Sequence, residues 1–115
     1  MFRGTTNTLA PLALLIAMGC SSDVSRSLGA QCEDRSDCDE RCLRGNDYPD
    51  GMCTTSCERD RDCPTTAHCV DEEGGVCLYS CRELRDCEFL GRDWECKDKD
   101  AREADVEEVK VCFGR

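Results

Sequence analysis

The chain of 115 residues carries 25 acidic and 15 basic side chains, which give it a formal net charge of −10. A chain of this length holds one modest domain. The acidic balance excludes a nucleic-acid-binding protein, because phosphate contacts require clusters of Lys and Arg, and it argues against electrostatic docking on anionic lipid. Such a surface is typical of a soluble exported domain that avoids nonspecific association.

The first 19 residues have the composition of an export signal. Arg3 is the only charged residue before Asp23, and residues 9–19 are almost entirely apolar. A basic start, an apolar run of about eleven residues and small residues at its end are typical of a signal peptide. The run is too short to span a bilayer, which takes about twenty helical residues. We therefore predict that residues 1–19 are a signal peptide and that the rest of the chain is exported.

Cys20 follows this segment directly and stands apart from the other cysteines. The run Ala17-Met18-Gly19-Cys20-Ser21 resembles the signal of bacterial lipoproteins, although Ala17 replaces the leucine that the family prefers. The resemblance implies that the sulfur of Cys20 receives a diacylglyceryl group, that the chain is cut before it and that the new amine is acylated. Two or more acyl chains anchor a protein stably in a membrane. By the same analogy, Ser21 in place of aspartate implies transfer to the outer membrane.

An ordinary secretory cut is the alternative. Ala17-Met18-Gly19 also fits the small-x-small cleavage site, and cleavage there would release a soluble protein with a free thiol at Cys20. The chain has 13 cysteines, and an odd number in an oxidising compartment leaves one without a partner. This parity favours lipidation, because acylation removes Cys20 and leaves twelve cysteines to pair.

Residues 20–31 are predicted to be a lipid-anchored flexible tether. After Cys20 the segment is polar, rich in serine and without hydrophobic periodicity, as flexible linkers are. Fully extended, it would reach roughly 36–40 Å, enough to lift the domain clear of the headgroups.

Residues 32–115 are predicted to form a small disulfide-rich domain. This segment contains twelve of the 13 cysteines and few large apolar residues. Such a cysteine content in a short exported chain is typical of a disulfide scaffold. Ordering a residue costs about 1.5 kcal/mol, which so small a core does not offset, whereas each disulfide contributes about 2–4 kcal/mol. We expect no fold without the disulfides.

The twelve cysteines form three tandem units, 32–53, 57–77 and 81–112. Five residues always separate the first cysteine from the second, and three separate the fourth from the next unit, while the other two gaps vary. An aspartate precedes every second cysteine, and a basic residue lies shortly before it. This register indicates an internal triplication. The repeated pairs are Arg35 and Asp37, Arg61 and Asp62, and Arg85 and Asp86.

Each segment between the third and fourth cysteine is predicted to be a short β-hairpin. Turn signals precede Gly51 and Gly75, and the fourth cysteine follows two residues after each glycine, as on a return strand. In unit three the charged segment 98–108 lengthens the connection and could hold a helical turn. The fold class is therefore small disulfide-rich, with three four-cysteine units, short β-hairpins and little helix.

Confinement of the disulfides to the units leaves three pairings in each. We favour first-to-third and second-to-fourth, because these bonds clamp the loop between the first two cysteines onto the hairpin. First-to-second pairing remains possible, but it leaves the hairpin without a crosslink. The favoured bonds are Cys32-Cys42, Cys38-Cys53, Cys57-Cys69, Cys63-Cys77, Cys81-Cys96 and Cys87-Cys112.

The spacing from Cys32 to Cys112, with its Asp-Cys and Gly-x-Cys pairs, resembles the cysteine-rich repeats of the Dickkopf N-terminal type and, more distantly, EGF-like modules. The resemblance implies an extracellular binding or spacer module. The chain departs from EGF-like modules in having four cysteines in each unit instead of six, and it lacks their calcium-ligand run.

The sequence disfavours metal binding. Zinc sites use C-x2-C pairs in reducing compartments, whereas the short gaps here are x3 and x5 in an exported chain. Calcium needs several converging oxygens, and the two acidic clusters lack a calcium-loop spacing. We expect instead that the aspartate before each second cysteine caps backbone amides in a tight turn. The two acidic clusters are Asp34, Asp37, Asp39 and Glu40, and Asp98, Asp100 and Glu103.

Catalytic chemistry has little support in the sequence. His68 is the only histidine, so the commonest general base occurs once, and we expect it in an exposed loop beside Cys69. No nucleophile elbow or HExxH motif accompanies it. We predict neither an enzyme nor a cofactor.

Phe89, Arg92 and Trp94 lie in the widest second gap, that of unit three. They could contact a partner, since Trp and Arg dominate binding hot spots. The interpretation that we prefer is that Trp94 and Phe89 shield the disulfides of this unit as a miniature core.

Together these features predict a lipid-anchored protein of the bacterial cell envelope, held at the outer membrane through its N-terminal lipid. Its disulfide-rich module would bind a protein or glycan partner or serve as structure. The alternative is a secreted disulfide-knotted inhibitor or toxin-like protein.

Overall fold

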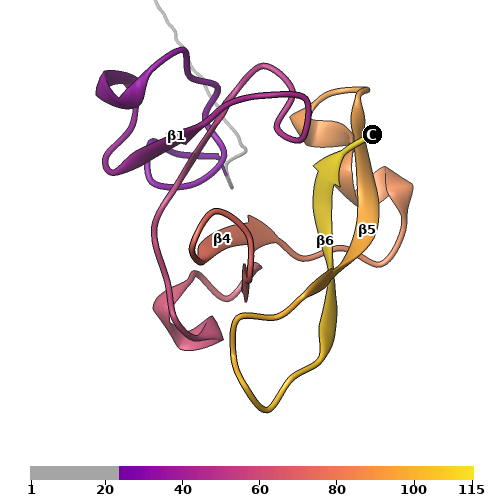
Figure 1. The fold of residues 1–115 in the computed structure, drawn as a ribbon. Coiled ribbons are helices and arrows are strands. Elements are labelled where there is room, and N and C mark those ends of the chain that lie inside the picture. The colour runs from indigo at the N-terminus through magenta and orange to yellow at the C-terminus, as the bar shows by residue number, and fades with distance from the viewer. Residues whose placement is uncertain (1–23) are drawn as a thin grey trace, which may run out of the picture.

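The computed structural model describes residues 24–115 (Figure 1), so the predicted signal peptide and Cys20 lie outside the described residues. Three antiparallel β-hairpins follow one another along the chain, and a short 3-10 helix precedes each. This architecture, with six disulfides, confirms the predicted fold class. The elements are η1 (Arg35–Asp37), β1 (Arg41–Leu43), β2 (Met52–Thr54), η2 (Asp60–Asp62), β3 (Ala67–Val70), β4 (Val76–Tyr79), η3 (Leu84–Leu90), β5 (Trp94–Asp100) and β6 (Glu108–Gly114).

Each 3-10 helix lies in the constant five-residue gap between the first and second cysteines. The backbone N–H of Cys38 donates to the carbonyl of Arg35 at 3.0 Å, and that of Cys63 donates to Asp60 at 2.9 Å. Five residues are enough for a single turn of this tight helix. In unit three, where the second gap is wider, η3 continues past Cys87 to Leu90.

The hairpins place the third and fourth cysteines of each unit opposite one another. Residues in direct register on an antiparallel pair project from the same face. Both cysteines of a hairpin therefore face the 3-10 turn of their own unit. The opposed pairs are Cys42 and Cys53, Cys69 and Cys77, and Cys96 and Cys112.

The third hairpin is longer than the sequence predicted. Residues 98–100 continue β5 and residue 108 begins β6, so the helical turn expected within 98–108 is wrong. Asp98 lies directly opposite Lys110, and their side chains are 3.6 Å apart. Opposite charges on facing strands stabilise such a pair, so the charged residues of this segment extend the two strands.

The predicted tether is also shorter than expected, because residues 25–31 fold onto the domain. The N–H of Gly29 donates to the carbonyl of Cys53 at 2.8 Å, and the N–H of Cys53 donates to Ala30 at the same distance. Leu28 is only 3% exposed, and its carbonyl accepts the hydroxyl of Tyr79 at 2.9 Å. A single buried leucine, with no periodic partner nearby in the sequence, anchors this segment.

The three units share one hydrophobic core. The hydroxyl of Thr54 donates to the carbonyl of Cys77 at 2.6 Å, which joins units one and two. Tyr48 and Phe113 meet edge to face with ring centroids 5.4 Å apart, which joins units one and three. The units therefore form one packed body. The core includes Leu43, Tyr48, Met52, Val70, Val76, Leu78, Leu90, Trp94, Val111 and Phe113.

Gly75 shows why the Gly-x-Cys pattern recurs. Its carbonyl accepts the N–H of Cys57 at 3.0 Å, its φ is +105°, and a Cβ there would overlap the carbonyl oxygen of Cys57. A side chain is excluded by this close approach of the first cysteine of the unit. The neighbouring Gly74 also has a positive φ, +84°, but a Cβ there would meet only open space.

We predict that Gly75→Ala destabilises the domain by about 2–4 kcal/mol, since left-handed backbone strain adds to steric overlap with backbone atoms. Gly74→Ala, the matched control, carries the strain alone and should cost about 1 kcal/mol. Urea unfolding of the oxidised proteins, followed by circular dichroism, measures both. Equal losses would contradict the packing of the first cysteine against the return strand.

Candidate functional site

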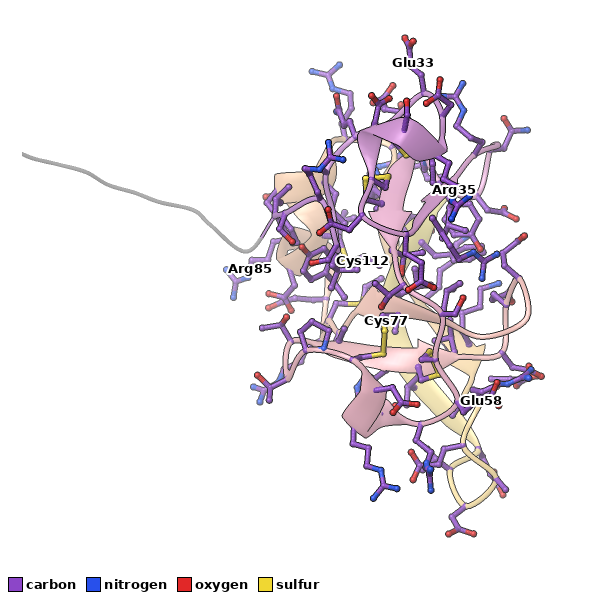
Figure 2. The ribbon with its side chains drawn as sticks, turned by 90° about the vertical axis from the view of Figure 1, so that its left-hand side faces the viewer. Glu33, Arg35, Glu58, Cys77, Arg85 and Cys112 are labelled. Atoms are coloured by element: carbon purple, nitrogen blue, oxygen red, sulfur yellow. A yellow bond between two sulfur atoms is a disulfide. The ribbon has the colours of Figure 1, made fainter. Side chains whose placement is uncertain are left out.

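The disulfides join the first cysteine of each unit to the third and the second to the fourth, which is the pairing favoured from the sequence. The Cα atoms of the bonded cysteines lie 5.3–6.0 Å apart, within the usual range for a disulfide. Figure 2 shows Cys77 and Cys112 in the interior, while charged side chains such as Glu33 and Arg85 lie at the periphery. The six bonds are Cys32–Cys42, Cys38–Cys53, Cys57–Cys69, Cys63–Cys77, Cys81–Cys96 and Cys87–Cys112.

Partial reduction of the native protein, followed by alkylation and peptide mass mapping, should recover these six bonds and no bond between units. The reason is geometric, because each hairpin presents its two cysteines to its own 3-10 turn. A bridge that joined cysteines of two different units would overturn this arrangement.

The cysteines meet the distance requirement of a metal site but not its chemistry. In each unit, three sulfurs lie within 4.8 Å of one another. Zinc binds thiolates, whereas all of these sulfurs are already bonded in disulfides. The clusters are therefore the crossing points of the two disulfides of a unit. Their members are Cys32, Cys38 and Cys42; Cys57, Cys63 and Cys77; and Cys81, Cys87 and Cys112.

The repeated aspartates cap the turns that begin the 3-10 helices, as predicted. One carboxylate oxygen of Asp62 accepts the backbone N–H groups of Glu58 and Arg59 at 3.0 and 3.1 Å. Asp37 accepts the two equivalent N–H groups of unit one at 2.9 and 3.4 Å. Asp86 accepts those of unit three at 2.8 and 3.2 Å. The aspartate before the second cysteine is thus structural in all three units.

These hydrogen bonds lower the pKa of two of the aspartates. The N–H of Glu58, and then that of Arg59, holds the pKa of Asp62 below its ordinary value of 3.8. The equivalent N–H groups lower the pKa of Asp86. Donors that bond the charged form favour it over the neutral form.

A lowered pKa in the folded state makes stability depend on pH in a defined direction. The contribution of Asp62 is present above 3.8 and is lost as the pH falls through the lower folded-state pKa. We predict that Asp62→Asn is less stable than the parent at neutral pH and loses less stability between pH 5 and pH 2. Urea unfolding across that range measures this difference.

Asp105→Asn is the control for this prediction, because no hydrogen bond to the side chain of Asp105 is present in residues 24–115. It should keep the parent profile. If Asp62→Asn lost stability with acid as steeply as the parent, the role of Asp62 as a charged cap would be wrong.

The acidic clusters considered for calcium are engaged with protein groups. Glu40 accepts the N–H of Ser56 at 2.8 Å, which lowers the pKa of Glu40. Glu103 accepts the N–H of Asp60 at 3.0 Å and so ties the β5–β6 loop to unit two. In both clusters, carboxylates act as local acceptors, and they do not converge on one point.

His68 does not lie in an exposed loop, so the prediction from the sequence is wrong. It is in β3 and partly buried, and its Nδ1 lies 2.8 Å from one carboxylate oxygen of Asp60. The other oxygen of Asp60 accepts the N–H of Cys69 at 2.8 Å. Asp60, to which no sequence pattern pointed, thus fixes η2 against β3.

The predicted partner contacts of unit three do not form one surface. Trp94 is 2% exposed in the core, so it is not available to a partner. Phe89 is 50% exposed, and its ring lies edge-on against Tyr79 with centroids 4.9 Å apart. Arg92 is exposed. The miniature-core interpretation is therefore correct for Trp94 and wrong for Phe89, because 3-10 geometry turns Leu90 inward and leaves Phe89 half in solvent.

The described surface has hollows that are open to solvent. One of about 310 Å³ lies beside η3 and includes Leu84, Arg92 and Arg115 in its lining. Another, of about 730 Å³, lies on unit one and is lined by polar groups such as Arg44 and Asn46. Small-molecule sites enclose most of their ligand, so these shallow surfaces suit contact with a larger molecule.

No helix within residues 24–115 is long and apolar enough to cross a membrane. Neither a protein-family model, nor a curated protein, nor a solved structure matches this chain.

Proposed function

We propose that this protein is a lipoprotein of the bacterial cell envelope, acylated at Cys20, whose disulfide-rich domain is a binding or structural module and not an enzyme. The domain would be displayed outside the cytosol at the outer membrane, close to the bilayer, and its partner would be a protein or a glycan.

Cysteine parity is the observation that carries this proposal. All twelve cysteines from Cys32 to Cys112 are paired with one another in six disulfides. Cys20, the thirteenth cysteine, therefore has no partner left in the chain. In an oxidising compartment a leftover thiol invites pairing between molecules, and acylation of the sulfur prevents it.

The hydrogen bonds made by the histidine and the repeated aspartates support a binding or structural module and not an enzyme. The single histidine is held by Asp60, and the repeated aspartates are hydrogen-bonded to backbone N–H groups. These side chains, which belong to the types that supply general acid–base chemistry, have structural partners here. What the domain offers another molecule is a rigid, charged surface with shallow hollows.

The intact mass of the protein extracted from membranes of a Gram-negative host tests the proposal. We expect a chain that begins at Cys20, carries a diacylglyceryl group and an N-acyl group, and lacks two hydrogens for each of the six disulfides. Globomycin should block cleavage, and Cys20→Ser should abolish acylation while leaving the disulfides intact. Recovery of an unmodified protein in the aqueous phase would contradict lipidation and favour the secreted inhibitor.

A further inference from the structure

Two of the exposed apolar side chains lie near the point where the described chain begins. Four large apolar side chains are exposed in residues 24–115: Val24, Leu84, Phe89 and Val106. Val24 is the first described residue and is 43% exposed, while Leu84 and Phe89 lie on η3 and are 47% and 50% exposed. Val106 lies in the loop at the far end of the β5–β6 hairpin (Figure 1).

A short series of contacts connects the beginning of the described chain to Phe89. The carbonyl of Leu28 accepts both the N–H of Ser25, at 2.8 Å, and the hydroxyl of Tyr79, at 2.9 Å. The ring of Tyr79 in turn meets the ring of Phe89 edge to face, with centroids 4.9 Å apart. Val24 precedes Ser25 directly, so the N-terminal segment leaves the domain beside this aromatic pair.

The same region is held rigidly. Gly29 has a φ of +102°, and a Cβ there would overlap the hydroxyl of Tyr79, so the turn at residues 25–29 fits closely against that ring.

The length of chain beyond this face limits its distance from a membrane. Five peptide links separate Cys20 from Ser25. At 3.3–3.6 Å for each residue, they span at most about 18 Å. A lipid on Cys20 therefore keeps Phe89 and its neighbours close to the headgroups, whereas Val106 is free to lie much farther away.

We propose that the exit face, defined as Val24 and Phe89, rests on the bilayer surface, with the ring of Phe89 in the headgroup region of zwitterionic lipid. This inference rests on the proposed function, because the acyl chains on Cys20 bring the face to the membrane. Aromatic side chains favour the membrane–water interface, and tethering makes a weak contact effective by raising its local concentration. The contact is apolar, since the acidic domain is not attracted to anionic lipid.

Depth-dependent quenching tests the exit face in the full lipidated protein. Phe89→Trp and the matched control Val106→Trp are reconstituted in phosphatidylcholine vesicles with and without brominated acyl chains. The buried Trp94, the only native tryptophan, is a background common to both and is subtracted with the parent protein. We expect brominated lipid to quench Phe89→Trp at least threefold more than Val106→Trp, with a blue shift of its emission. Val24→Trp gives a second report if Phe89→Trp does not fold.

The outcomes separate the two proposals. Protein that floats with the vesicles but shows equal quenching at positions 89 and 106 would overturn the exit face and leave lipidation in place. Protein that does not float would overturn both. A blue shift without quenching by bromine, growing with protein density in the membrane, would identify a second copy of the chain as the occupant and overturn contact with lipid.

Discussion

The whole structure depends on one constraint: the two cysteines that face each other across a hairpin are not bonded to each other but to the 3-10 turn that precedes the hairpin. Cys69 and Cys77 are in direct register on β3 and β4, and each is bonded to one end of the 3-10 turn before them, at Cys57 and Cys63. The two crossing bonds fix the turn on the hairpin in both position and rotation. The same arrangement in all three units lets a chain with few large apolar residues adopt a single fold, since crosslinks restrict the unfolded chain.

Packing between the three disulfide-crosslinked units joins them into one domain. Only three residues lie between the fourth cysteine of one unit and the first of the next, and these linkers are hydrogen-bonded: the N–H of Cys77 donates to the carbonyl of Thr55 at 3.2 Å. Ser80 forms a bridge with Val111. Each unit therefore buries its apolar residues against its neighbours, and the core is continuous although no single unit could supply it.

The sequence predicted what is local and repeated, and it missed what depends on distant contacts. The constant gaps identified the units, and the aspartate before each second cysteine, such as Asp62, was correctly interpreted as a turn cap. Leu28 was missed because its burial depends on Tyr79, 51 residues away. The strand position of His68 and the exposure of Phe89 were missed for a related reason: each depends on which side of a short element meets the core, and elements of three to seven residues show too little periodicity to reveal it.

The crossing bonds also limit how far the chain can be drawn out by a mechanical load. Through Cys38–Cys53, Cys63–Cys77 and Cys87–Cys112, a force applied between Cys32 and Cys112 runs along about 26 peptide links in place of the 80 that separate them in the sequence, or roughly 90 Å at full extension. Even if all noncovalent contacts were lost, the chain between these two cysteines would extend to only about a third of the length that it would reach without disulfides. A domain fixed to a cell surface at one end, and pulled by a bound partner at the other, would yield little under shear.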